Sequence, residues 1–282
     1  MKYTKMHGLG NNYIYVNEFE VKLQEAELAL IAVKVSDVNF GIGSDGMILI
    51  GPSRVADFRM RIFNSDGSEA KNCGNGLRCV AKYVYDRSMT HERHFTIETL
   101  GGIVHVEVHV DEEAVQTVSI DMGKPRLMKK EIPMLGDEDS ITINESVQID
   151  GADYQMTVVS MGNPHSVMFV EDIEQAAVNQ IGPTVEHAAL FPERINVEFV
   201  QVQNSHEIDF RVWERGSGIT MACGTGACAA VVAGVLGGHL ERAKPITVHL
   251  LGGDLVITYA DNDHVYMKGP ATFISDGVFY LR

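Results

Sequence analysis

The chain has 282 residues, of which 45% are hydrophobic and 22% charged, and its formal net charge is −15. These proportions are ordinary for a folded globular protein, and the length suffices for two medium-sized domains. The acidic excess argues against nucleic acid or an anionic membrane surface as the main partner. Residues 1–7 lack the apolar core of a signal peptide, and the longest apolar stretch, around 227–236, is too short to span a membrane. We therefore expect a cytoplasmic protein with no nucleic-acid or membrane partner.

Short apolar runs bounded by Gly, Asp, Asn or Pro predict a chain rich in strands. In the first half, strands are expected over 13–16, 47–50, 58–63, 94–98, 103–109 and 118–122. Helices are expected over 23–35 and 74–87, where apolar residues recur at helical spacing. In the second half, strands are expected over 155–160, 166–170, 196–203, 207–213, 246–250, 255–259 and 265–268. A third helix is expected over 225–236, ending at two glycines.

The two halves share several motifs in the same order. Asn72-Cys73-Gly74-Asn75-Gly76 corresponds to Ala222-Cys223-Gly224-Thr225-Gly226, and each precedes a largely apolar run. Three further pairs are in register: 10–11 with 162–163, 60–63 with 210–213, and 96–104 with 246–256. A single match between Gly-rich turns could arise by chance, but four in order indicate a duplicated architecture.

The duplication predicts an α+β fold with two pseudo-symmetric lobes. Each lobe is expected to be a bent, mostly antiparallel sheet or barrel around a central helix, with the active site in the cleft between the lobes. We assign residues 1–117 to the first lobe and 118–270 to the second, with the tail 271–282 returning to the first. The polar segment 129–147 has no counterpart in the first half, and we interpret it as the crossover.

Cys73 and Cys223 each precede an expected helix, where backbone N–H groups and the macrodipole favour a thiolate. A lowered pKa would populate both thiol and thiolate near working pH. Two thiols on opposite sides of a carbon can remove a proton from one face and deliver one to the other. The charge that develops on an adjoining carboxylate would be stabilised by the two helix N-termini. The pattern therefore suits a two-base racemisation.

Six linked motifs strengthen this hypothesis. They occupy residues 5–11, 63–69, 73–79, 161–165, 194–199, and 213–218 together with 222–228. In these motifs the chain resembles, from end to end, the diaminopimelate epimerases, which are amino-acid epimerases independent of pyridoxal phosphate. The resemblance implies an isomerase that interconverts LL- and meso-diaminopimelate, with that small molecule as partner and no cofactor or metal. Its product would enter lysine and peptidoglycan precursor synthesis.

The resemblance also implies a role for each matching residue. Cys73 and Cys223 would be the acid and base, and His165 would support them. The remaining residues would bind the substrate. The reacting carboxylate would be held by the N–H groups of Gly74, Asn75, Gly224 and Thr225, and the reacting ammonium by Asn11 and Glu214. The distal end would be bound by Asn64, Asn163, Asn196 and Arg215. One departure concerns the loop Gly43–Gly46, where Gly46 follows Asp45 and some family members carry Gln.

Other interpretations remain open. Cys79 and Cys228 lie within expected helices and are interpreted as buried structural thiols. A zinc site of four cysteines is disfavoured because both pairs fall at helix starts. The same scaffold could serve a racemase of another amino acid, such as histidine, or a non-catalytic binding relative. The sequence leaves the oligomeric state open, a homodimer included.

Overall fold

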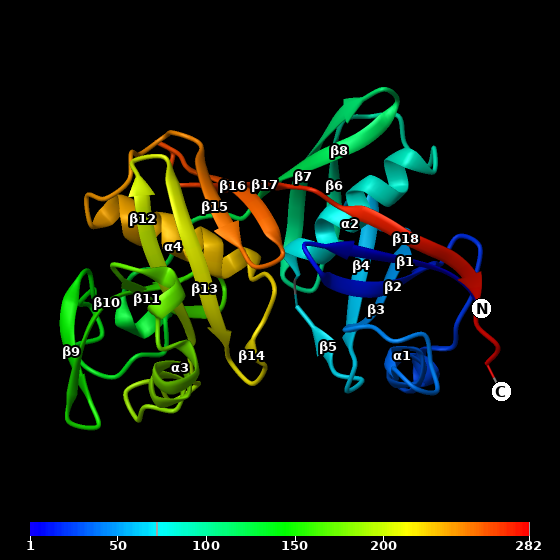
Figure 1. Ribbon diagram of the computed structural model, residues 1–282. Helices are drawn as coiled ribbons and strands as arrows, with labels where there is room; N and C mark the ends of the chain where they lie inside the picture. The colour runs from blue at the N-terminus through cyan, green and yellow to red at the C-terminus, as the bar shows by residue number, and fades with distance from the viewer. Residues whose placement is uncertain (72, 282) are drawn as a thin grey trace. The chain divides into compact units, whose positions relative to one another are not determined.

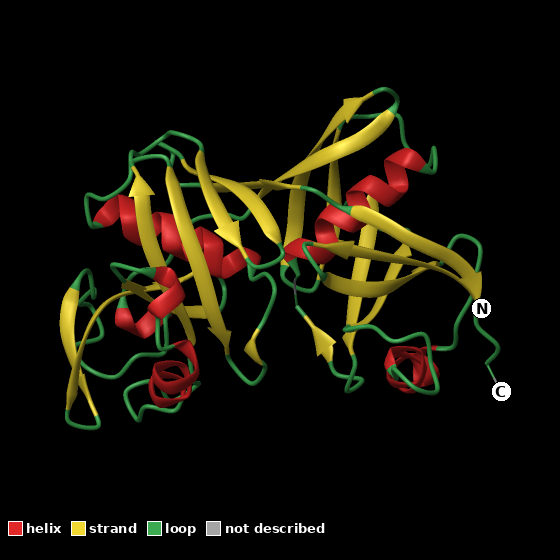
Figure 2. Cartoon of the chain, viewed as in Figure 1, coloured by secondary structure: helices red, strands yellow, loops and turns green. Residues whose placement is uncertain are grey.

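The computed structural model describes residues 1–71 and 73–281, so Asn72 of the first cysteine motif lies outside the described residues. The chain divides into two compact units. The first unit contains Met1–Ile120 together with Lys268–Arg282, and the second contains Asp121–Met267. Strands dominate both units, and helices are few (Figures 1 and 2). The predicted α+β class is confirmed.

The first unit is a mixed, mainly antiparallel sheet with two α-helices. Its strands are β1 (Lys2–Gly8), β2 (Asn11–Asn17), β3 (Gly46–Gly51), β4 (Phe58–Asn64), β5 (Glu69–Ala70), β6 (His94–Thr99), β7 (Gly102–Asp111), β8 (Ala114–Asp121) and β18 (Thr272–Val278). The strands pair in the order β18-β1-β2-β3-β4-β6-β7-β8, with β5 added beside β4. Only the β2–β3 and β4–β6 pairs within this series are parallel.

The second unit repeats this order of pairing. Its strands are β9 (Glu145–Ile149), β10 (Ala152–Ser160), β11 (Pro164–Phe169), β12 (Asn196–Asn204), β13 (Glu207–Glu214), β14 (Gly218–Ile219), β15 (Ile246–Leu250), β16 (Gly253–Tyr259) and β17 (Val265–Gly269). The β10–β11, β12–β13 and β15–β16 pairs are antiparallel, whereas β11–β12 and β13–β15 are parallel. The same alternation runs from β1 to β7, so the internal repeat predicted from the sequence is present in the topology.

The helices occupy matching places in the two units. Helix α1 (Leu28–Ser36) joins β2 to β3, and α3 (Val178–Glu186) joins β11 to β12. Helix α2 (Gly74–Asp86) follows β5, and α4 (Gly224–Leu236) follows β14. Short 3₁₀ turns lie at η1 (Glu25–Glu27), η2 (Lys129–Glu131) and η3 (Ile173–Gln175). None of the helices within the described residues is long and apolar enough to cross a membrane.

Each unit has its own core. In the first, Leu28, Ile31 and Val35 of α1 pack against Ile14 and Leu49 of the sheet. In the second, α4 packs against β10, β11, β12 and β16, and nearly all of its residues are buried. A helix buried on every side needs an apolar sequence all round, which explains its run of Ala and Val.

Part of the segment 129–147 differs from its interpretation as a polar crossover. Ile132 is 1% exposed and Met134 is 7% exposed, and both belong to the core of the second unit. The segment also contains η2 and the start of β9. The whole segment lies within the second unit, which begins at Asp121, and its two buried apolar side chains belong to that unit's core. The interpretation of 129–147 as the crossover between the halves is therefore wrong.

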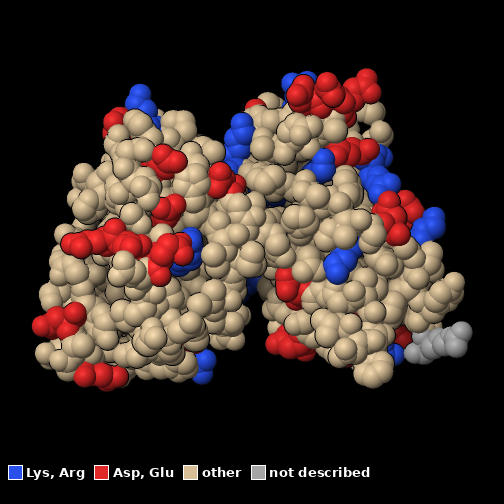
Figure 3. Space-filling model, viewed as in Figure 1, with Lys and Arg blue, Asp and Glu red and all other residues tan. Residues whose placement is uncertain are grey.

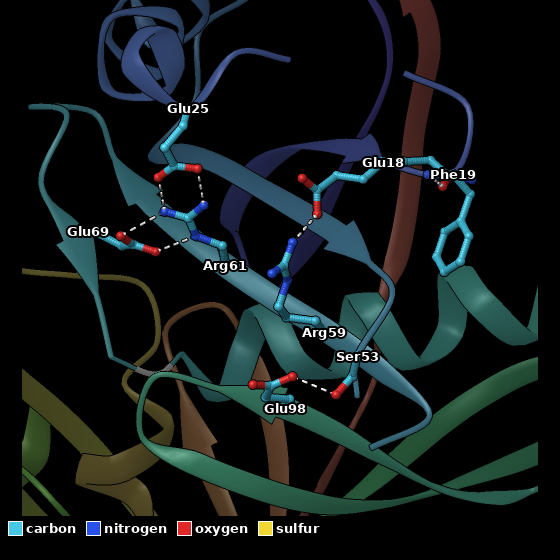
Figure 4. A network of polar contacts seen from close by, with 9 residues as sticks. Glu18, Phe19, Glu25, Ser53, Arg59, Arg61, Glu69 and Glu98 are labelled. Carbon is cyan, nitrogen blue, oxygen red and sulfur yellow. Dashed lines mark hydrogen bonds and ion pairs between the residues drawn. The ribbon is translucent and has the colours of Figure 1, made fainter. Parts of the chain in front are cut away.

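Two arginines of β4 form ion pairs with glutamates from neighbouring segments of the first unit (Figure 4). The Arg61 guanidinium donates to Glu25 of η1 at 2.7 and 2.8 Å and to Glu69 of β5 at 2.7 and 3.1 Å. These hydrogen bonds raise the pKa of Arg61. Arg59, two residues before Arg61 on the same strand, donates to Glu18 at 3.1 Å. Arg61 therefore links η1, β4 and β5 around the turn that follows Asn64.

Candidate active site

Cys73 is the N-cap residue of α2. Its backbone is extended, with φ −153°, and its Sγ accepts a hydrogen bond from Gly76 N–H at 3.4 Å. A Cβ at Gly76 would lie 2.6 Å from Ile48 Cδ1, so the first turn of α2 has no space for a side chain there. Gly74 and Asn75, which were predicted to bind a carboxylate, are the first two residues of the helix. The helix starts where the sequence predicted.

Cys223 is the N-cap of α4 in the same way. Its φ is −120°, and its Sγ accepts from Gly226 N–H at 3.4 Å and lies 3.6 Å from Thr225 Oγ1. Gly224 and Thr225 are the first two residues of this helix. Cys223 is only 5% exposed, whereas Cys73 is partly exposed. The two motifs therefore adopt equivalent capping geometries, but the second thiol is more deeply buried.

The surroundings of Cys223 oppose ionisation. Burial raises the pKa of this thiol well above its usual range, and the nearby carboxyl groups of Glu214 and Glu198 raise it further. The Thr225 hydroxyl and the Gly226 N–H act in the opposite direction. The expectation that the helix N-terminus would lower the thiol pKa is wrong for Cys223, because desolvation and two carboxylates outweigh the capping interactions. At neutral pH this cysteine keeps its proton.

Asn11 lies beside Cys73. The Cys73 thiol donates to Asn11 Oδ1 at 3.7 Å, and Asn75 Nδ2 donates to the same oxygen at 3.5 Å. Asn11 Nδ2 in turn donates to Asp45 Oδ2 at 2.9 Å. The structure thus groups three of the predicted site residues, and Asp45 fixes which end of the Asn11 amide faces the thiol. We did not predict this role of Asp45 from the sequence.

The loop that carries Asp45 also explains the departure from the family pattern. A Cβ at Gly46 would lie 2.8 Å from Tyr13 Cε1 and would clash with the Phe63 carbonyl oxygen. A glutamine side chain therefore has no space at position 46 in this backbone. Gly46 is paired with Asn64 across β3 and β4, and Asn64 Nδ2 donates to Ser68 Oγ at 3.0 Å. Strand pairing thus brings Asn64 next to the loop that positions Asn11.

A second group of predicted residues lies in the second unit. Asn163 Oδ1 is 3.0 Å from His165 Nε2, and His165 is paired with Asn196 across the parallel strands β11 and β12. Asn196 Nδ2 donates to Pro164 O at 2.8 Å, and Asn196 Oδ1 accepts from Arg215 N–H at 2.9 Å. Asn196 is 3% exposed. Both ends of its amide therefore brace the backbone around the other site residues.

Glu214 is the last residue of β13, and Arg215 follows it. The Thr220 hydroxyl donates to the Glu214 carboxylate, and Arg215 Nη1 donates to the Glu193 carbonyl at 2.7 Å. Both side chains are held by the loops around them, which fixes the region that would carry an ammonium and a carboxylate of a ligand. The carboxylates of Glu186 and Glu198 also belong to this region and were not predicted. Glu198 left a signal in the sequence, because it is a charged residue between the apolar residues Val197 and Phe199 of a predicted strand.

The other two cysteines lie within the helices. Cys79 and Cys228 are fully buried in α2 and α4, as their apolar surroundings in the sequence predict. Burial raises the pKa of Cys79 to about 11. The four cysteines, all among the described residues, are not joined by disulfide bonds. Among residues 1–71 and 73–281, no group of three or more His, Cys, Asp or Glu is arranged to hold a metal ion.

The family described as diaminopimelate epimerase matches residues 3–128 and 157–274. The chain belongs to the diaminopimelate epimerase family. A diaminopimelate epimerase of Geobacillus sp. (strain WCH70) is 60% identical over 278 residues, which are 99% of this chain and 98% of that protein. One of Bacillus cereus (strain AH187) is 58% identical over 280 residues, covering 99% and 97%.

Solved structures resemble the fold at much lower identity. A Bacillus anthracis phenazine biosynthesis protein of the PhzF family has a TM-score of 0.72 at 17% identity, covering 100% of this chain and 99% of that one. A hydroxyproline epimerase of Agrobacterium vitis has a TM-score of 0.65 at 12% identity, covering 98% and 90%. These likenesses support the fold. The diaminopimelate epimerase family is an isomerase family, and this chain is an enzyme of that class.

Proposed function

We propose that this epimerase interconverts LL- and meso-diaminopimelate by passing the α-proton between two thiols, Cys73 and Cys223, without a cofactor. The observation that carries the proposal is the matched capping geometry: each cysteine opens a helix, with its sulfur over the first turn. Family membership and relatives at about 60% identity over nearly the whole chain support the substrate. The product serves lysine biosynthesis and peptidoglycan precursors.

The proton balance of the reaction follows from the two thiols. In one direction, the Cys73 thiolate removes the α-proton, and the electron pair of the broken C–H bond moves onto the carboxylate. The Cys223 thiol then delivers its proton to the opposite face of the carbon. The reverse reaction exchanges the two roles. The raised pKa of Cys223 keeps this thiol protonated before substrate binds, which suits it to act as the acid in this direction.

The developing negative charge needs donors that are already in place. We propose that the N–H groups of Gly74 and Asn75 on α2, and of Gly224 and Thr225 on α4, hold the reacting carboxylate. N–H groups in the first turn of a helix have no partner within the helix, and the helix dipole favours an anion there. Stabilisation of this kind is often the largest single contribution to the rate.

The other polar groups of the site determine which substrate is recognised. Asn11 and Glu214 are proposed to bind the ammonium group at the reacting centre. Arg215, Asn163 and Asn64 are proposed to bind the distal amino-acid group, with the Arg215 guanidinium on its carboxylate. Asn196 is proposed to contribute at the same distal group by holding the backbone at Pro164 and Arg215 through its two amide hydrogen bonds. These distal residues would distinguish diaminopimelate from amino acids whose side chain does not end in a second amino-acid group.

We also propose that the enzyme works in the cytoplasm. The mechanism requires both cysteines as thiols, and a reducing compartment maintains them in that form. The charged surface is compatible with this location, because acidic and basic side chains are interspersed over the face drawn in Figure 3.

Proton NMR in D₂O tests the reaction directly. The reduced enzyme is incubated without pyridoxal phosphate and with LL-diaminopimelate, L-histidine or L-lysine in parallel. We expect loss of one α-hydrogen signal and appearance of the meso form with diaminopimelate alone. Exchange in histidine instead would overturn the substrate while preserving the chemistry. Absence of exchange in all three, with the thiols verified as reduced, would overturn the proposed activity.

The two-base mechanism has its own test. Cys73→Ala and Cys223→Ala should each abolish conversion of LL- to meso-diaminopimelate. Cys228→Ala is the matched control, because Cys228 is a buried cysteine on the same helix as the second thiol. Full activity in either of the first two variants would contradict the mechanism.

A further inference from the structure

A carboxylate and an imidazole are buried together in the second unit. Glu198 of β12 and His165 of β11 have fully buried side chains, and Glu198 Oε1 lies 2.7 Å from His165 Nδ1. Neither the two-base mechanism nor the proposed substrate contacts give Glu198 a role. A buried carboxyl group is costly unless it is paired or uncharged, so its presence requires a reason.

The other ring nitrogen of His165 restricts where the protons are. Nε2 lies 3.0 Å from Asn163 Oδ1, and an amide oxygen can only accept. Nε2 must therefore carry a hydrogen. The short contact between Nδ1 and Oε1 then contains one proton, which sits either on the carboxyl oxygen or on the ring. Both arrangements give the pair a net charge of zero.

The environment of Glu198 agrees with a shared proton. Burial raises the pKa of Glu198, nearby Glu214 raises it further, and His165 opposes both. Glu198 Oε2 is buried and has no hydrogen-bond partner among the described residues. An unpartnered oxygen is costly on a full carboxylate and less so on a carboxylic acid.

Helix α4 also packs against the carboxyl group of Glu198. A Cβ built on Gly226 would lie 2.9 Å from Glu198 Oε1, 3.1 Å from Phe210 Cζ and 3.2 Å from Cys223 Sγ. Glu198 therefore packs against the first turn of the helix that Cys223 caps. Its position is fixed by this packing and by the hydrogen bond to His165.

We propose that Glu198 and His165 form a positioning pair that shares one proton and fixes the Asn163 amide. In this arrangement Asn163 Oδ1 accepts from His165, and the Asn163 NH₂ group is turned away from the ring, as a donor for a substrate carboxylate. The inference rests on the proposed function, in which Asn163 binds the distal end of diaminopimelate. Glu198 thus acts on the substrate only through two other side chains.

NMR of the substrate-free, ¹⁵N-histidine-labelled full chain tests the pair without reference to catalysis. The His165 signals are assigned by their loss in His165→Asn. We expect Nε2 to be protonated and Nδ1 to resonate between the values of a protonated and an unprotonated nitrogen. His249 provides an internal reference, because its two nitrogens face the acceptors Glu207 and Asp254, both at 2.8 Å. An unprotonated His165 Nε2 would overturn the proposal, since the Asn163 amide would then have to present its NH₂ group to the ring.

Kinetics of two variants test the consequence for substrate binding. Glu198→Gln can still hydrogen-bond His165 Nδ1 and should keep KM for LL-diaminopimelate close to wild type. Glu198→Met has a similar volume but no polar atom for the ring, so KM should rise about tenfold while kcat changes less. Glu207→Met removes the carboxylate from an exposed pair with His249 and is the control; it should leave KM unchanged.

The outcomes separate the inference from the proposed function. Equal KM values for Glu198→Gln and Glu198→Met would overturn the positioning role. If Glu198→Met does not fold, the NMR result on the wild-type enzyme and the KM of Glu198→Gln still decide. If the enzyme fails to epimerise diaminopimelate but its His165 signals are as expected, the proposed function fails and the proton-sharing pair stands.

Discussion

The Glu186 carboxylate accepts a hydrogen bond from the Trp213 indole N–H at 2.7 Å. Its other oxygen accepts from the Gly216 backbone N–H at 2.9 Å. Glu186 is 2% exposed, and its two partners stand on either side of Glu214 and Arg215 in the chain. One buried carboxylate on α3 therefore holds both ends of the segment that is proposed to bind the substrate.

Glu186→Gln should weaken substrate binding more than it slows the chemistry. The amide has one accepting oxygen, so either Trp213 or Gly216 loses its acceptor, at a cost of about 1–3 kcal/mol. We expect KM for LL-diaminopimelate to rise several-fold with a smaller change in kcat, as steady-state kinetics would measure. Arg194→Gln is the control, because Arg194 is 54% exposed and lies 3.6 Å from Glu186. Identical KM values in the variant and the wild type would contradict this role.

Gly226→Ala should damage the site at Cys223. The new methyl group would lie 2.9 Å from Glu198 Oε1 and 3.2 Å from Cys223 Sγ, so one of them must move. We expect destabilisation of about 1–3 kcal/mol, as for other overpacked positions, together with a large loss of kcat. Gly234→Ala on the same helix would clash with the Leu240 side chain and provides the control. It should lower the unfolding temperature while leaving kcat near wild type; equal kcat losses in both variants would argue against a local effect.

Alkylation should distinguish the two proposed catalytic thiols. Cys223 is 5% exposed and its pKa is raised, so little thiolate is present at neutral pH. Iodoacetamide should therefore modify the partly exposed Cys73 first in the substrate-free enzyme, as peptide mass spectrometry would measure. The rate at Cys223 should continue to increase above pH 9, because a raised pKa shifts thiolate formation to higher pH. Faster modification of Cys223 than of Cys73 at pH 7 would refute this order.

His249 should stabilise the second unit more at acidic than at alkaline pH. Hydrogen bonds to Glu207 and Asp254 raise its pKa in the folded state. This contribution is complete below the unfolded-state pKa of about 6.5 and is lost as pH rises through the higher folded value. Unfolding free energies of wild type and His249→Asn should differ more at pH 6 than at pH 9. Because the side chain is 32% exposed, solvent screening limits the extra difference to about 0.5–1 kcal/mol. A difference that grows with pH would contradict the assignment.

Local patterns in the sequence predicted the parts of the fold that depend on short-range structure. The helices at Cys73 and Cys223 begin where capping and glycine spacing indicated. Strand β1 was missed because Lys2–Gly8 mixes basic, aromatic and small residues, although alternate side chains are buried. Helix α3 was missed because Gly182 and Pro183 interrupt its pattern. Gly182 is needed there, since a Cβ would lie 2.5 Å from Trp213 Cγ.

In the candidate site, too, local patterns in the sequence were informative and long-range contacts were not. The motifs predicted Asn11, Cys73, His165 and Arg215 as site residues, but the carboxylates that contact Asn11 and His165 come from other parts of the chain. The proximity of Asp45 to Asn11 depends on how the loop before β3 folds back, and the contact of Glu186 with Trp213 depends on packing of α3. The rise in the Cys223 pKa likewise depends on burial and on two approaching carboxylates, which no local motif contains.

The pairing of β18 with β1 has a consequence for biosynthesis. Met1 N–H donates to Phe279 O at 2.8 Å, next to this strand pair in the first unit. The second unit, by contrast, is a continuous segment and can begin folding while translation proceeds. Until the residues of β18 have been made, one edge of β1 has no partner strand, because β2 pairs with the other edge. An unpaired edge of this kind can recruit other chains. The growing chain is therefore exposed to aggregation through this edge until residues 272–278 join the sheet as β18.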